Sequence, residues 1–184
     1  MVIDIETLAV PEKLPPGMLV EVVEVGLVVL GDDLEVLEKR EWAVAPNGVC
    51  EESTVRWAME LAVKKGVMPI WAEIREVNRA WSMEAVLREI AVLWSLHECR
   101  EVWSKGAFDV DLLRQHYGAL KMFCPWKYHE ARDLRTLMKA CGVKGLPYDE
   151  VAHTALADAL AEAEDLRECL RLTACREGME RGVA

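Results

Sequence analysis

The chain has 184 residues, of which 52% are hydrophobic and 29% are charged, and its formal net charge is −10. This length and composition provide enough apolar side chains for one folded domain over residues 1–184 and exclude a largely disordered chain. The apolar runs are shorter than the ~18 residues of a membrane span, and the acidic balance disfavours a surface that coats nucleic acid without selectivity.

Two features predict a cytoplasmic protein. No basic region precedes the apolar residues Val2 and Ile3, so we expect no secretory signal. The six cysteines form no Cys-x-x-Cys pair, which favours free thiols over a zinc site or a disulfide framework.

Residues 100–144 hold nine basic and five acidic residues, which indicates either a face for a phosphate chain or a solvated helical face.

Hydrophobic periodicity predicts strands first, and then helices and strands mixed. Strands are expected at 1–6, 19–30, 35–44 and 101–103, and helices at 53–65, 83–97, 108–117, 131–141 and 153–175. This order is typical of an α/β or α+β fold in which helices pack on the faces of a sheet. The apolar seam of the helix at 83–97 faces either the sheet or a second copy of the chain in a homodimer.

The first strand carries two acidic residues among apolar ones. Asp4 and Glu6 are two residues apart, so their side chains point to the same side of the strand. Neighbouring carboxylates repel each other and raise each other's pKa unless a cation lies between them. The pair is therefore either a metal site or two solvated acids at a strand end.

Two further acidic residues stand near predicted helix starts. Asp109 follows the strand at 101–103 and the glycine turn at Gly106, with Asp111 as an alternative, and Asp158 lies in the opening turns of the last helix. At a helix start an aspartate either serves a site or complements the helix dipole. In a regular helix His153 would point ~140° away from Asp158, so the two converge only if His153 lies in the approach to the helix.

Together, four carboxylates and one histidine match the requirements of two-metal phosphodiester hydrolysis: Asp4, Glu6, Asp109, Asp158 and His153. Carboxylate oxygens suit Mg²⁺ or Mn²⁺, and two such ions ~4 Å apart stabilise the attacking and departing oxygens of an in-line displacement. A histidine with a pKa near its ordinary value of ~6.5 accepts the proton of the attacking water.

With these motifs, nearly the whole chain resembles the DEDDh-type 3′–5′ exonucleases. Asp4-Ile5-Glu6 is similar to the first motif of the family, residues 103–109 to the second, and residues 153–158 to the third. The resemblance implies an α/β fold of the ribonuclease H-like class, with a central mixed β-sheet, antiparallel first strands and flanking α-helices.

Two segments between the last two motifs resemble the small phage and mycobacterial branch of these exonucleases. They are Pro125-Trp126 and the Arg-Asp-Leu-Arg-Thr run at 132–136. The chain departs from related sequences in having one residue, not two, between Gly106 and the Phe108-Asp109 pair. This shortening keeps Asp111 as the fallback for Asp109.

The resemblance also implies roles for the candidate residues. Asp4 would bridge two Mg²⁺ or Mn²⁺ ions, Glu6 and Asp158 would complete one site, and Asp109 would hold the other ion partly through water. His153 would be the general base.

Four residues are candidates for binding the substrate. By the same resemblance Leu8 packs against the terminal nucleotide and Phe108 lies near the penultimate one, with core packing as the alternative for both. Lys105 and Arg132 are candidate phosphate contacts.

The sequence therefore predicts a 3′–5′ exonuclease that acts on single-stranded or 3′-overhanging RNA or DNA and releases nucleoside monophosphates. Two alternatives are a phosphatase with an aspartate nucleophile and a non-catalytic nucleic-acid-binding module. Phosphatases of that kind carry a second aspartate where Glu6 stands here, which counts against the first alternative.

Overall fold

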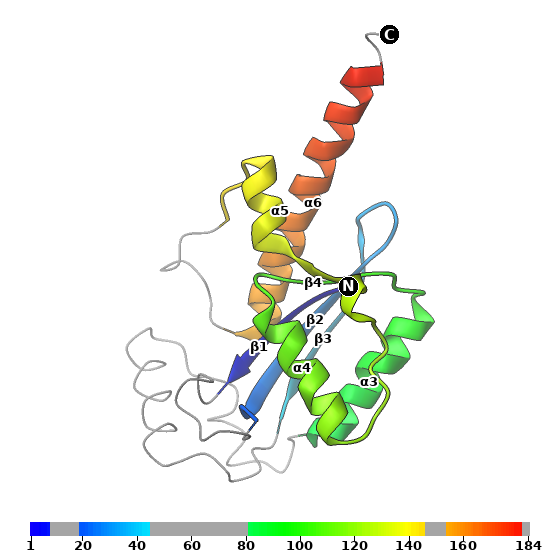
Figure 1. Cartoon of the computed structure of the whole chain (residues 1–184), viewed down its shortest axis with the longest axis vertical. Coiled ribbons are helices and arrows are strands. Elements are labelled where there is room, and N and C mark those ends of the chain that lie inside the picture. The colour runs from blue at the N-terminus through cyan, green and yellow to red at the C-terminus, as the bar shows by residue number, and fades with distance from the viewer. Residues whose placement is uncertain (8–18, 45–80, 146–153, 182–184) are drawn as a thin grey trace, which may run out of the picture.

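The computed structural model describes residues 1–7, 19–44, 81–145 and 154–181 (Figure 1). The strands in these ranges are β1 (Val2–Thr7), β2 (Val22–Leu30), β3 (Val36–Ala43), β4 (Val102–Ser104) and β5 (Ala131–Asp133). The helices are α3 (Met83–Leu96), α4 (Phe108–Ala119), α5 (Leu134–Cys141) and α6 (Ala155–Arg181), with a 3-10 turn η2 (Tyr128–Glu130). No helix in the described ranges is both long and apolar enough to cross a membrane. The predicted helix at 53–65 lies outside the described residues.

The strands form one mixed sheet in the order β3-β2-β1-β4-β5. β2 pairs antiparallel with both β1 and β3, whereas β4 pairs parallel with β1 and β5. The first three predicted strands and the antiparallel start of the sheet are thus confirmed.

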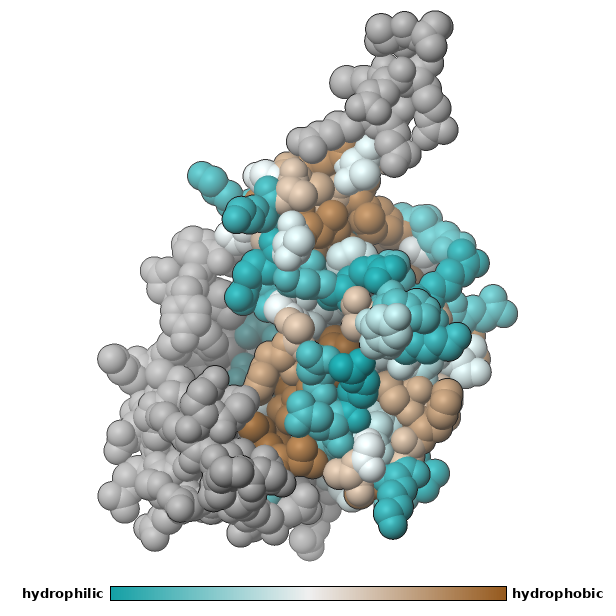
Figure 2. Space-filling view, viewed as in Figure 1, coloured by the Kyte–Doolittle hydropathy of each residue, from teal (hydrophilic) through white to brown (hydrophobic). Residues whose placement is uncertain are grey.

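The alternation of side chains along β1 supplies two separate cores. Ile3 and Ile5 belong to the core on the face covered by α3 and α4. Val2 belongs to the core on the opposite face, which α5 and α6 cover. In Figure 1, α6 runs along the sheet and its distal end projects beyond the body of the molecule. Figure 2 shows hydrophobic side chains gathered where this helix leaves the body.

The apolar seam of α3 packs against the sheet. Val86, Leu87 and Ile90 are fully buried in the core that contains Ile3 and Ile5. Of the two alternatives for this seam, the structure therefore supports the intramolecular one.

The helix predicted at 131–141 begins later than expected, because its first three residues form β5 beside β4. Asp133 is the N-cap of α5: its Oδ1 accepts a hydrogen bond from the backbone N–H of Arg135 at 3.0 Å, and Thr136 Oγ1 donates to its Oδ2 at 2.6 Å. β5 is only three residues long, too short to show the alternation that predicts a strand, and it becomes a strand through its pairing with β4. The predicted start of this helix was therefore wrong.

Candidate functional site

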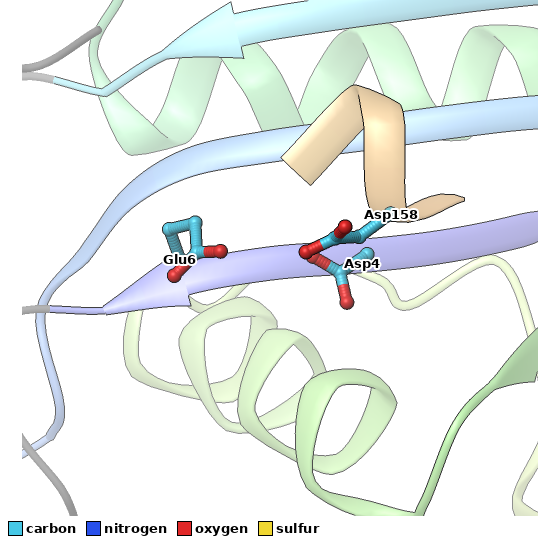
Figure 3. A group of neighbouring side chains, drawn as sticks. All are labelled: Asp4, Glu6 and Asp158. Atoms are coloured by element: carbon cyan, nitrogen blue, oxygen red, sulfur yellow. The ribbon is translucent and has the colours of Figure 1, made fainter. Parts of the chain in front are cut away.

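Three carboxylates from two elements meet on the α6 face of the sheet. Asp4 and Glu6 project from β1, and Asp158 projects from the first turn of α6 (Figure 3). One oxygen of each residue lies within 4.8 Å of an oxygen of each of the others. The alternation of β1 predicted the shared side of Asp4 and Glu6, and the packing of α6 across β1 and β2 brings Asp158 to them.

The start of α6 is held directly on β2. Gly26 is the register partner of Asp4, and a Cβ at Gly26 would lie 2.1 Å from the carbonyl carbon of Ala155. Only glycine permits this close approach of helix and strand. The fully buried Glu24 accepts a hydrogen bond through Oε1 from the backbone N–H of Ala155 at 3.1 Å. These contacts place Asp158 over β1.

The sequence did not predict that Glu24 and Gly26 position the site. An acid and a glycine on one side of a Val-rich strand were the available signal, because a strand buried on both faces has little reason to carry either. Burial and a hydrogen bond with Glu41 raise the pKa of Glu24 to about 8.

A fourth carboxylate approaches from α4. Gly106, with a φ of +115°, makes the turn after β4, and Asp109 lies in the first turn of the helix that follows. After burial, the charge of Asp109 is the largest cause that raises the pKa of Asp4. Asp111 instead forms an ion pair with Arg114 at 2.9 Å, and its side chain is 46% exposed. The structure therefore brings Asp109, and not Asp111, close to Asp4.

Glu162 is a fifth acid of this region, and the sequence analysis did not single it out. It lies on α6 one turn after Asp158 and is 4% exposed. Burial and then the charge of Asp109 raise its pKa to about 8. The four-residue spacing from Asp158 was the available signal, because residues four apart lie on the same side of a helix.

The electrostatics of the site call for positive charge. Burial raises the pKa of Asp4 well above its ordinary value, and the charges of Asp109, Glu162, Glu6 and Asp158 raise it further. Burial raises the pKa of Asp109 to about 7, although Arg135 acts in the opposite direction. Clustered buried carboxylates are costly unless a cation compensates them. Closely spaced oxygen donors of this kind fit a hard divalent ion such as Mg²⁺ or Mn²⁺.

The predicted substrate residues that the structure describes do not gather at one place. Phe108 begins α4 next to Asp109 and is 40% exposed. Lys105 forms an ion pair with Asp165 at 3.3 Å. Arg132 pairs with Glu101 at 2.8 Å, at the opposite end of β4 from Asp109. His153 and Leu8 lie outside the described residues.

A basic residue near the acids was not predicted as a site residue. Arg135 donates a hydrogen bond to the backbone carbonyl of Lys105 at 3.0 Å, and its guanidinium group lies 3.9 Å from the position of a Cβ on Gly106. Its charge acts on Asp109. Arg135 was visible in the Arg-Asp-Leu-Arg-Thr run, but the sequence alone does not tell which of the two arginines lies near the site.

Comparison with known proteins identifies the family. A model described as the 3′–5′ exoribonuclease Rv2179c-like domain matches residues 1–170. The chain belongs to this family of DEDDh-type exonucleases, and its mixed five-strand sheet with flanking helices is the ribonuclease H-like fold. The domain is that of a phosphodiester hydrolase, which sets aside the phosphatase and the non-catalytic alternatives. No curated protein matches the chain.

Proposed function

We propose that this exoribonuclease-family chain removes nucleotides from the 3′ end of RNA or single-stranded DNA, including 3′ overhangs, and releases nucleoside monophosphates by a two-metal mechanism. The observation that carries the proposal is the convergence of Asp4, Glu6 and Asp158 within 4.8 Å. An RNA substrate follows from the family, and action on DNA is part of the proposal. The proposal also includes a single domain over residues 1–184 and a cytoplasmic location. A homodimer stays a prediction.

The carboxylates would hold two Mg²⁺ or Mn²⁺ ions in the arrangement that the family motifs imply. Asp4 would help to hold both ions, Glu6 and Asp158 would complete one site, and Asp109 would hold the other ion partly through water. Bound ions of this kind supply a Lewis acid at the scissile phosphate and a more acidic bound water. The raised pKa of Asp4 supports this assignment, because burial and the neighbouring carboxylates disfavour its charged form and a cation would compensate both.

His153 is the proposed general base, which takes the proton of the attacking water. Its place in the sequence supports this role, because it directly precedes Thr154, whose carbonyl accepts a hydrogen bond from the N–H of Asp158 at 3.0 Å. A protonated imidazole accepts no proton, so hydrolysis should fall as the pH drops below the pKa of His153.

The substrate side of the site is assigned by position and chemistry. Phe108, partly exposed beside Asp109, provides an apolar surface for the penultimate nucleotide, and Leu8 is proposed for the terminal one. Lys105 and Arg132 remain proposed phosphate contacts. Arg135 joins them, because it is an exposed residue whose charge lowers the pKa of Asp109.

Digestion of end-labelled oligomers tests the function. RNA and DNA strands labelled at the 3′ or the 5′ end, single-stranded or with a 3′ overhang, are incubated with Mg²⁺ or Mn²⁺. We expect 3′-labelled strands to release a labelled monophosphate at once, while 5′-labelled strands shorten stepwise. Asp109→Asn should stop the reaction, and the matched control Asp111→Asn should not. Internal cleavage, or shortening from the 5′ end, would contradict the proposal.

A further inference from the structure

Glu162 is a buried carboxyl group that the roles assigned above leave unused. It lies on the same side of α6 as Asp158, one turn farther along the helix, and is 4% exposed. Its neighbours in charge are Asp109 and Asp158, which repel its carboxylate, and Lys105, which attracts it. Asp4 also feels the charge of Glu162, more strongly than that of Glu6 or Asp158. Glu162 therefore borders the site from the side of Asp109.

One oxygen of this carboxyl group has no protein partner. The backbone N–H of Lys105 lies close enough to lower the pKa of Glu162, which places this carboxyl group beside the turn that leads into Asp109. Within the part of the chain that the structure describes, Glu162 Oε2 is buried and lacks any hydrogen-bond partner. A buried carboxylate oxygen without a partner is costly, so native sites usually supply one. A water or a bound group among the acids would supply that partner.

The two ends of the acidic cluster differ in the ligands they offer. Asp4, Glu6 and Asp158 can all contact one ion, because their oxygens lie within 4.8 Å of one another. Asp109 and Glu162 lie outside that set of three. The carboxylates around a cation at Asp109 would therefore lie farther from one another than the three at the other end. Mg²⁺ suits such a place, because it keeps several of its waters and is held through them by surrounding acceptors.

We propose that Glu162 is a fifth carboxylate of the metal centre, which accepts hydrogen bonds from the waters of the cation held by Asp109. This inference rests on the proposed function. It assigns Glu162 as a positioning residue for that cation and gives its free oxygen a partner. It also explains why an acid stands at this point of a helix that otherwise packs Ala159, Ala163 and Leu166 against the sheet.

The competing explanation is a neutral glutamic acid that only fills space between α6 and the Lys105 turn. The two explanations predict opposite orders for two variants. Glutamine keeps the size and one oxygen acceptor but loses the charge, so it should serve a packing role well and a cation poorly. Aspartate keeps the charge but is one methylene shorter, so it should disturb packing more than it disturbs water-mediated binding.

Counting bound Mn²⁺ tests the proposal without any activity measurement. Free Mn²⁺ is followed by electron paramagnetic resonance during titration of the metal-free protein. We expect two ions on the wild type. In Glu162→Gln the tighter ion should remain and the weaker one should bind about 10- to 100-fold less tightly, as for other residues that orient metal-bound groups. Glu162→Asp should lose less than Glu162→Gln. Thermal unfolding of each metal-free variant verifies that it is folded.

Two controls separate the possible failures. Glu164→Gln changes an exposed acid of the same helix that pairs with Arg167, and it should leave both ions in place. Asp4→Asn should lose both. A Glu162→Gln titration that matches the wild type, or a single ion on the wild type, would overturn the role of Glu162 while Asp4→Asn still loses binding. If Asp4→Asn also binds like the wild type, the metal centre of the proposed function is itself wrong.

Discussion

β1 contributes side chains to both faces of the sheet, and the two sets of side chains differ in chemistry. On the α3 and α4 side, β1 contributes Ile3 and Ile5 to a closed apolar core. On the α6 side, after Val2, it contributes Asp4 and Glu6, and burial together with the charges of the surrounding acids raises the pKa of Asp4. The α3 and α4 side of β1 therefore contributes apolar burial alone, while the α6 side combines its own apolar core with repelling acids that a bound cation would compensate. Neighbouring residues of one strand should thus respond to substitution in opposite ways.

The largest expected effect comes from Asp4→Ala. Hydrolysis of an RNA oligomer should fall to the background of the buffer, because the carboxylate proposed to bridge both ions is lost. The melting temperature of the metal-free variant should equal or exceed that of the wild type, because a buried and repelled acid is removed. Labelled-oligomer digestion and thermal unfolding measure both quantities on one preparation. A wild-type rate of hydrolysis in Asp4→Ala would contradict the proposal that this side of β1 carries the metal centre.

Ile3→Ala, one residue away, should show the reverse pattern. Ile3 is fully buried, and truncating it should lower the free energy of unfolding by about 2–5 kcal/mol. Digestion at low temperature, where the variant stays folded, should keep a rate within a few-fold of the wild type. A loss of activity at full stability would mean that the apolar face also shapes the site.

The pH dependence of stability sharpens the same contrast. The pKa of Asp109 is raised to about 7 and that of Glu162 to about 8, so between pH ~4 and 8 the folded chain binds more protons at these sites than the unfolded chain. The free energy of unfolding of the metal-free protein should therefore fall as the pH rises through this window.

Melting temperatures from pH 5 to 8 measure this trend. Adding Mn²⁺ at pH 8 should recover the loss, because the cation compensates the ionised acids. Asp109→Asn should flatten the metal-free profile. A metal-free stability that rises steadily to pH 8 would contradict the electrostatic account of the α6 face.

The smallest effect is expected at the arginines. Arg135→Ala should raise KM for an RNA oligomer about tenfold, which is the scale of one hydrogen bond to a charged group, with a smaller change in kcat. Arg132 already pairs with Glu101 beyond the other end of β4, so Arg132→Ala should change KM less. Steady-state kinetics of both variants on one substrate decide between them. The reverse order would restore Arg132 as the main phosphate contact.

Much of the fold was predictable because its signals are local. A Val-rich run, an alternating first strand and a helical spacing of leucines are each contained in a short segment, and they predicted β1, β2, β3, α3 and α6. The start of α5 was not predictable in this way, because residues 131–133 become a strand only through pairing with β4. The family match carries the exonuclease assignment beyond what any single motif supports.

The sequence by itself determined that Asp4 and Glu6 share one side of a strand, because the period of a strand is fixed by backbone geometry. Only the tertiary structure decided that Asp109 rather than Asp111 faces Asp4, that Arg135 rather than Arg132 lies near the acids, and that Glu162 is buried among them. These choices depend on how helices from distant parts of the chain pack onto the sheet. The close contact of Gly26 with Ala155 sets that packing for α6, and although a glycine in a Val-rich strand indicates a close approach, the residues around it do not tell which segment approaches.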